Sequence, residues 1–240
     1  PQRDGGAGNY TLPFDATQTS VPSRYTGWER VSMVNGSALT LGGTFVLGGS
    51  DTGTGAMSID ATSRLIVTTG TLAPFTSGQL ATLNNAGLID MSTDSSSTTD
   101  SLTVNGNYIG TGGRLALQTM LGADNSPSDK LVVSQGTLLG ATAISITNLG
   151  GAGALTVKDG IEVVQATQGA TSSVGAFSLA GPVSAGAFDY HLFRGGVTAG
   201  TEQNYYLRST VPAQPTPDAV ITPPTPAPGT PALPPNPGNT

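Results

Sequence analysis

Short stretches of alternating apolar and polar residues recur along the chain, and most of them end at glycine or asparagine. In "DSLTVNG" (100–106) and "DKLVVSQG" (129–136), aliphatic residues two apart would point to one face of a strand and their polar neighbours to the other. No window of a dozen residues has apolar positions at the i, i+3, i+4 and i+7 spacing of an amphipathic helix. The pattern predicts an all-β protein.

Three of these stretches share an aspartate, an aliphatic residue two positions later and a valine two positions after that. Their aspartates are Asp100, Asp129 and Asp159, so the phrase recurs at an almost constant spacing. Short strands repeated at such intervals, with polar turns of variable length, are typical of a solenoid whose coils stack strand on strand. We therefore expect a parallel β-helix, and a β-sandwich is the alternative.

Large aromatic residues are rare except near the end of the strand patterns. "FDYHLF" (188–193) and "NYYLRS" (204–209) predict two strands joined by a polar loop. The last coil of a solenoid exposes an apolar cross-section and unpaired strand edges, so it requires a cap. We expect this hairpin to be the folding cap. Its cap residues would be Phe188, Tyr190, Leu192, Tyr205, Tyr206 and Leu207. On the first strand Phe188, Tyr190 and Leu192 share one face, and on the second Tyr205 and Leu207 share one.

A proline-rich tail follows the hairpin: more than a third of the residues from Pro212 to Thr240 are proline. Such a sequence predicts an extended polyproline-type spacer. We expect four segments, namely an irregular N-terminal part or end of a preceding segment (1–24), β-helix coils (25–128), C-terminal coils with the cap (129–209), and a proline-rich linker (210–240). The chain opens with neither Met nor an apolar signal core, so we expect an internal piece of a longer protein.

The composition of the chain argues against two classes of function, nucleic-acid binding and a membrane-spanning helix. Only 10% of the residues are charged, the formal net charge is −6, and the nine cationic residues are scattered. Nucleic acid is therefore not an expected partner, because phosphate binding needs a basic patch. No apolar run is long enough to be predicted to span a membrane as a helix.

The candidate catalytic residues are few. His191 is the only histidine, and Asp189 lies two positions before it on the same predicted strand face. A Ser-His-Asp site would also need a placed serine and a pocket, so we interpret His191 as a surface residue. "TDSL" (99–102) is similar to a serine-lipase phrase but is better explained as a strand start. We predict neither a catalytic site nor a cofactor site.

Cation binding has two candidate positions. "GGSDTGTG" (48–55) resembles a glycine-rich calcium repeat but occurs once, so we interpret it as a loop. Asp100, Asp129 and Asp159 could form a stacked row of carboxylates. We interpret them instead as turn residues that accept backbone N–H hydrogen bonds, and we predict no metal site.

The order of these motifs resembles the C-terminal end of pertactin-like autotransporter passengers. The resemblance rests on "SAGAFDYHLFRGG…NYYLRS" with its proline-rich tail, on "SDKLVVSQGTLLGATAISITNLGGAGAL" (128–155) and on "YTGWERVSMVNGSALTLGG" (25–43). It extends from about Tyr25 to Ser209. It implies a right-handed parallel β-helix that is exported through the outer membrane of Gram-negative bacteria and displayed at the cell surface.

The resemblance further implies an autochaperone region at about Asp129 to Arg208, which would fold first and template the coils before it. The partner would be the protein's own C-terminal β-barrel translocator, beginning beyond Thr240. The absence of cysteine would then suit passage through a narrow pore. The leading function is a non-enzymatic stem and autochaperone.

Two alternatives remain. One is an adhesin or virulence module that binds a host receptor or matrix protein through loops such as 48–57 and 92–101. The other is a β-helical polysaccharide-degrading enzyme, which would need acidic and basic residues clustered on one face. The sequence does not determine the oligomeric state.

Overall fold

The computed structural model describes residues 3–6, 8–19, 22–93 and 96–210. Within these ranges the protein consists of strands and turns, and its one helix is the short 3-10 helix η1 (Pro22–Arg24). The all-β prediction is thereby confirmed. The predicted proline-rich linker lies outside the described residues. Nowhere in the described ranges is there a helix with the length and apolar character needed to cross a membrane.

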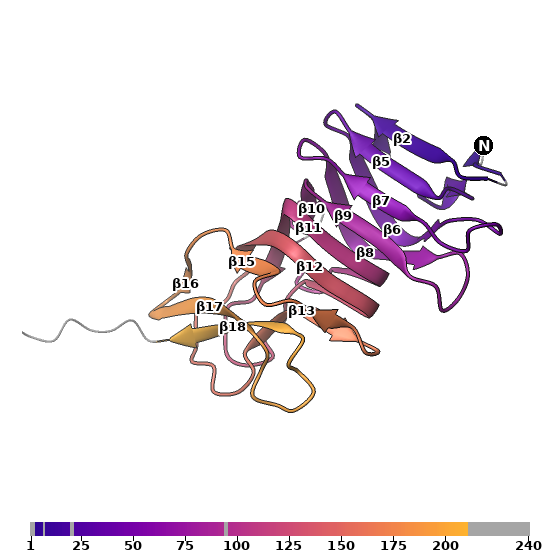
Figure 1. Cartoon of the computed structure of the whole chain (residues 1–240). Helices are drawn as coiled ribbons and strands as arrows, with labels where there is room; N and C mark the ends of the chain where they lie inside the picture. The colour runs from indigo at the N-terminus through magenta and orange to yellow at the C-terminus, as the bar shows by residue number, and fades with distance from the viewer. Residues whose placement is uncertain (1–2, 7, 20–21, 94–95, 211–240) are drawn as a thin grey trace, which may run out of the picture.

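One mixed sheet holds 16 strands, and a separate small sheet pairs β1 (Arg3–Asp4) with β4 (Tyr25–Thr26). Figure 1 shows the strands of the large sheet stacked as successive rungs from the indigo N-terminal end to the orange C-terminal part. Its parallel-paired strands are β2 (Thr11–Asp15), β3 (Gln18–Thr19), β5 (Arg30–Val34), β6 (Ala38–Leu47), β7 (Ala56–Ile59), β8 (Arg64–Pro74), β9 (Ala81–Asn85), β10 (Leu88–Asp90), β11 (Ser101–Thr119), β12 (Lys130–Asn148), β13 (Ile161–Thr167), β14 (Thr171–Ser172) and β15 (Phe177–Leu179).

The parallel pairs join strands that are distant in the chain. Ala38 of β6 pairs with Arg64 of β8, and Ser101 of β11 pairs with Lys130 of β12. Because alternate residues of a strand face the same side, this register stacks apolar side chains of successive strands on one another. The interior is built from these stacked rows.

Three apolar rows run along the stack, and their members are buried except for the partly buried Leu179. The first row is Leu39, Leu65, Ile89, Leu115, Ile144 and Leu179. The second is Val31, Met57, Leu83, Tyr108 and Leu138. The third is Phe45, Leu72, Val104 and Val133.

Glycines allow the long strands to bend. Strands β11 and β12 have 19 residues each, and their shared register shifts twice, between Gly106 and Tyr108 and between Thr111 and Gly113. Beside the second shift, Gly140 has a φ of 86°, and a Cβ there would lie 1.9 Å from the carbonyl oxygen of Gly110. A larger residue would be strained at this corner for both reasons.

The pairing changes at the C-terminal end. Strand β16 (Val183–Ala185) pairs with β17 (Phe188–Arg194), β17 pairs with β18 (Tyr205–Thr210), and β18 pairs with β13, all of them antiparallel. In Figure 1 these strands lie at the end of the stack of rungs, after β13. The parallel ladder thus ends in an antiparallel hairpin.

Candidate functional site

The two aromatic segments near the end of the chain form the expected hairpin. Strands β17 and β18 pair antiparallel, with Leu192 opposite Leu207 and Phe193 opposite Tyr206. Residues 195–204 form the connecting loop. Alternation within each segment was therefore sufficient to predict both strands.

The six predicted cap residues of the hairpin are all at least partly buried. Four are buried and two are partly buried and packed against the core. The buried ones are Tyr190, Tyr205, Tyr206 and Leu207, and the partly buried ones are Phe188 and Leu192. Phe193 lies outside this group, with 43% of its surface exposed and the Arg208 guanidinium 5.4 Å from its ring centroid.

Strand β18 covers one edge of β13, whose other edge pairs with β12. Ile161 pairs with Leu207 and Glu162 with Tyr206, and the register shifts before Val164. An uncovered edge of β13 would present a row of unpaired N–H and C=O groups. The hairpin satisfies them with its own backbone.

Aromatic rings connect the hairpin to the interior. The Tyr108 ring of β11 stacks on Phe177 of β15 at 5.6 Å, and Phe177 meets the Tyr205 ring edge to face at 5.0 Å. The Tyr205 hydroxyl donates to the carbonyl oxygen of Ser173 at 2.6 Å. Burial raises the pKa of both tyrosine hydroxyls. Rings in such geometries attract one another beyond the area that they bury.

Two hairpin side chains bind the loops that precede β12 and β13. The Tyr190 hydroxyl oxygen lies 2.9 Å from the carbonyl oxygen of Gly122 and accepts the Ala154 N–H at 3.0 Å. The Ser209 hydroxyl donates to the Ala154 carbonyl oxygen at 2.7 Å and accepts the Thr156 N–H at 2.8 Å. These hydrogen bonds anchor both hairpin strands to the preceding loops.

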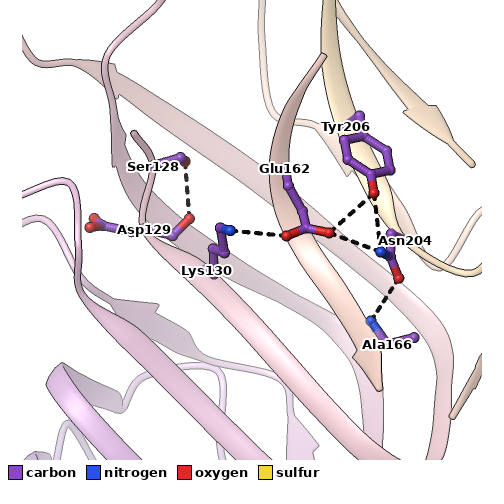
Figure 2. A network of polar contacts seen from close by, with 7 residues as sticks. All are labelled: Ser128, Asp129, Lys130, Glu162, Ala166, Asn204 and Tyr206. Carbon is purple, nitrogen blue, oxygen red and sulfur yellow. Dashed lines mark hydrogen bonds and ion pairs between the residues drawn. The ribbon is translucent and has the colours of Figure 1, made fainter. Parts of the chain in front are cut away.

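A polar network on the outer side joins β12, β13 and the hairpin (Figure 2). One Glu162 carboxylate oxygen lies 2.9 Å from Lys130 Nζ, and the other accepts Asn204 Nδ2 at 2.8 Å and the Tyr206 hydroxyl at 3.1 Å. The Asn204 Oδ1 accepts the Ala166 N–H at 2.9 Å. Burial, with the Glu162 carboxylate beside it, raises the pKa of Tyr206 to about 12.

An open groove of about 440 Å³ borders this network. Its lining includes Asp100, Ser126, Lys130, Glu162 and Tyr206, together with other hydroxyl and amide groups. Charges of both signs face it. Across the described ranges, no group of three or more His, Cys, Asp or Glu side chains is arranged to hold a metal ion.

The predicted equivalence of Asp159 with the other two aspartates is wrong. Ser101 pairs with Lys130, as the shared phrase requires for Asp100 and Asp129. The same phrase would pair Leu131 with Ile161, but Leu131 pairs with Val164. The loop before β13 is longer than the repeat implied, so Asp159 lies in that loop and not beside Asp129.

Two of the three aspartates, Asp129 and Asp159, accept backbone N–H hydrogen bonds, as we predicted. The buried Asp129 carboxylate accepts the Asp100 N–H at 2.9 Å and the Gln118 N–H at 2.7 Å. Asp159 accepts two N–H groups of the hairpin loop. Burial and the neighbouring Asp100 charge raise the pKa of Asp129 to about 6, against the effect of its two N–H donors.

The other candidate positions lie on strands or in a turn of the described chain. His191 is exposed on β17, as expected, and Asp189 is partly exposed on the same strand. The "TDSL" phrase leads into β11, where Leu102 is buried. Residues 48–55 form a turn closed by the Gly53 N–H on the Gly49 carbonyl oxygen.

Sequence reasoning missed the polar contacts that hold the hairpin. Besides Asn204 and Glu162, Arg194 donates to the Ser172 hydroxyl at 2.8 Å and to Gln203 Oε1 at 2.7 Å. The available signal was the arginine that ends one hairpin strand and the amide residues that precede the other. Ser172 and Glu162 could not be identified as partners from the sequence, because they lie on other strands.

The chain is similar in sequence to a known protein family and to several autotransporters. Residues 78–192 match the family described as Autochaperone Domain Type 1. The chain is 39% identical over 200 residues to the adhesin BmaC autotransporter of Brucella suis, covering 80% of this chain and 5% of that protein. It is 36% identical over 118 residues to the autotransporter adhesin AIDA-I of Escherichia coli, covering 49% of this chain and 9% of that protein.

The probable autotransporter YfaL of Escherichia coli is 40% identical over 126 residues, which are 50% of this chain and 9% of that protein. The chain thus spans less than a tenth of the length of each of these three relatives.

Proposed function

We propose that the chain is part of an autotransporter passenger stem, as its similarity to the type 1 autochaperone family and to autotransporters supports, and that its C-terminal end is the seed on which the stem folds. Residues 129–209 would form the seed, residues 25–128 would stack on it, and residues 1–24 would lead in from the preceding passenger. Residues 210–240 would link the seed to a translocator.

The proposed architecture is a right-handed parallel β-helix. Its support is the repeated parallel pairing of strands from successive repeats, as in Ala38 with Arg64 and Ser101 with Lys130, and the three apolar rows that this pairing stacks. Antiparallel sandwiches do not produce such a register. The right hand follows from the general preference of parallel crossover connections.

The observation that carries the proposal is the coverage of β13 by β18. The edge of β13 is closed by a hairpin that also contributes Tyr205 to the aromatic contact with Phe177. At the other end, among the described strands, β2 pairs only with β5. The edge of β13 is covered, whereas within the described ranges β14 and β15 pair only with β12. The covered edge of β13 and the single pairing of β2 favour growth of the stack away from the hairpin.

The physics of coil addition explains why a seed is needed. Parallel pairing between distant segments is slow to nucleate, because the chain must close long loops before contacts form. Once a seed exists, each further coil gains stacking and hydrogen bonds from a single existing neighbour. Outside the cell no ATP drives folding, so the free energy of coil addition can bias the direction of export.

The proposed location is the bacterial cell surface, reached through the outer membrane. The partner during export would be a C-terminal translocator, as the autotransporter relatives support. The role proposed for this part of the chain is structural and requires no catalytic chemistry of its own.

A second candidate function is adhesion, because two of the relatives are named adhesins. Loops 48–57 and 92–101 are the proposed contact positions for a host receptor or matrix protein. Solid-phase binding to immobilised matrix proteins tests this, with a variant in which only the exposed turn residues 50–52 are changed to glycine, because Met57 at the end of this stretch is buried in β7. Binding that survives the change would exclude this turn.

Surface display of the full-length gene product, with its own translocator, tests the seed. Deletion of residues 188–210 removes the hairpin and should abolish display of a folded passenger. The control is deletion of residues 38–63, which removes one repeat in register because Ala38 pairs with Arg64. The control should leave display largely intact. Equal loss of display in both deletions would contradict the proposal.

A further inference from the structure

Three long loops lie between the strands of the C-terminal part, and an aspartate of the first loop binds the backbone of the second. Asp124 belongs to the loop between β11 and β12. Its Oδ2 accepts the Val157 N–H at 2.7 Å, and its Oδ1 accepts the Lys158 N–H at 2.9 Å and the Gly160 N–H at 2.8 Å. One carboxylate therefore fixes three of the four amides from 157 to 160.

An aspartate of the second loop binds the third loop, which connects β17 and β18. Asp159 Oδ1 accepts the Val197 N–H at 2.6 Å and the Thr198 N–H at 2.8 Å. The approach is close, because a Cβ at Gly196 would lie 2.3 Å from the same oxygen. Only glycine fits there without displacing Asp159.

The two contacts share a short piece of backbone. Asp159 lies between Lys158 and Gly160, whose N–H groups both bind Asp124 Oδ1. The conformation that carries the Asp159 carboxylate towards the hairpin loop is thus held from both sides by Asp124. We propose that Asp124 is a positioning residue for Asp159, and that together they couple the hairpin loop to the loop before β12.

This coupling rests on the proposed function and deepens it, because it would extend the seed from the hairpin to the β11–β12 loop. The electrostatics agree with the geometry. Although burial opposes it, the three N–H donors hold the pKa of Asp124 below its ordinary value. Hydrogen bonds from Thr198 do the same for the pKa of Asp159. Both side chains are thereby kept as acceptors.

Amide hydrogen exchange by NMR on the intact purified chain tests the coupling. Asp124→Ala should accelerate exchange at Val197 and Thr198, which Asp124 does not contact, by roughly five-fold or more. Asp159→Ala should accelerate exchange at Val157 and Lys158 by the same factor, because a coupling free energy is reciprocal. The exchange rates are taken relative to a core amide of β12, which corrects for global unfolding.

Asparagine variants give a rescue test. Asp159 binds both amides through one oxygen, so Asp159→Asn keeps an acceptor and should restore protection at Val197 and Thr198. Asp124 uses both oxygens, so Asp124→Asn places an amide donor against a backbone N–H and should not rescue. If Asp124→Ala does not fold, Asp124→Asn carries the same exchange measurement.

The matched control is Asp60→Ala in the N-terminal part. Asp60 is a similar acceptor, binding the Asn35 N–H at 3.1 Å and the Thr62 N–H at 3.0 Å. Its loss should leave exchange at Val157 and Val197 unchanged. The coupling would be overturned if Asp124→Ala accelerated amide exchange only at its own partners, Val157, Lys158 and Gly160, and Asp159→Ala only at Val197 and Thr198.

The exchange experiment uses folded protein and does not depend on export. If the exchange rates accelerate reciprocally but surface display survives deletion of residues 188–210, the coupling between the loops stands and the proposed folding seed is refuted. If the loops exchange independently but display is lost when the hairpin is deleted, the folding seed stands and the coupling is refuted.

Discussion

The hydroxyl oxygen of Tyr190 lies 2.9 Å from the carbonyl oxygen of Gly122, 68 residues earlier in the chain. The same oxygen accepts the Ala154 N–H, and 1% of the Tyr190 surface is exposed. A single hairpin side chain therefore satisfies backbone groups of two preceding loops. These groups would otherwise be partly buried without a partner, which is costly.

Substitution of this tyrosine by phenylalanine isolates the hydroxyl. Tyr190→Phe keeps the ring but leaves the Ala154 N–H without its acceptor. We expect the free energy of unfolding to fall by about 1–3 kcal/mol, measured by urea denaturation. Tyr10→Phe is the control, because Tyr10 is 46% exposed and should change little. Equal stability of the two variants would show that the Tyr190 hydroxyl contributes nothing.

Leucine truncations separate stability from seeding. Leu207 of the hairpin and Leu65 of an earlier strand are both 0% exposed. Each change to alanine should lower the unfolding free energy by about 2–5 kcal/mol, because each leaves a cavity in the core. In cells, Leu207→Ala should impair surface display and Leu65→Ala should largely preserve it. Equal display defects at matched stability would make the hairpin merely another part of the core.

Local stability should follow the proposed folding order. We expect amide exchange in the wild-type chain to be slowest between Leu131 and Leu207, and faster before Asp100. The reason is that β13 is paired on both edges and the hairpin is held by Tyr190 and Ser209. Hydrogen exchange with mass spectrometry measures this gradient. Stronger protection in the N-terminal strands would argue against a C-terminal seed.

Asp129 should make stability depend on pH. Its folded-state pKa is raised to about 6 by burial and by the Asp100 charge, above the value of about 3.9 for an unfolded chain. Its stabilising contribution is therefore complete below about pH 4 and lost as the pH rises through about 6. Thermal unfolding of wild type and Asp129→Asn across this range should show the wild type losing stability relative to the variant as the pH rises.

The difference in stability between wild type and Asp129→Asn isolates the titration of Asp129 from that of the other carboxyl groups. Asp60 and Asp124 have lowered folded-state pKa values, so their contributions are lost only as the pH falls below about 4. A constant difference between wild type and Asp129→Asn from pH 4 to 7 would show that Asp129 does not titrate in this window.

The sequence by itself determined several of the strands and the hairpin. Alternation is a local property, because successive side chains of a strand point to opposite faces. It therefore located Tyr190, Tyr205 and Leu207 on core-facing positions before any tertiary contact was known. The Asp100–Asp129 equivalence was also readable, because the same phrase begins at both aspartates and the strands that follow them pair in that register.

Apart from the register that follows Asp100 and Asp129, only the tertiary structure decided which strands pair and in which register. Leu131 pairs with Val164 because the loop before β13 is longer than the repeat implied, and loop length is almost unconstrained by alternation or by closure entropy. The bonds from Glu162 to Tyr206 and to Asn204 join residues 44 and 42 positions apart. Such partners meet only after the strands and loops between them have taken their lengths, so no local pattern in the sequence specifies them.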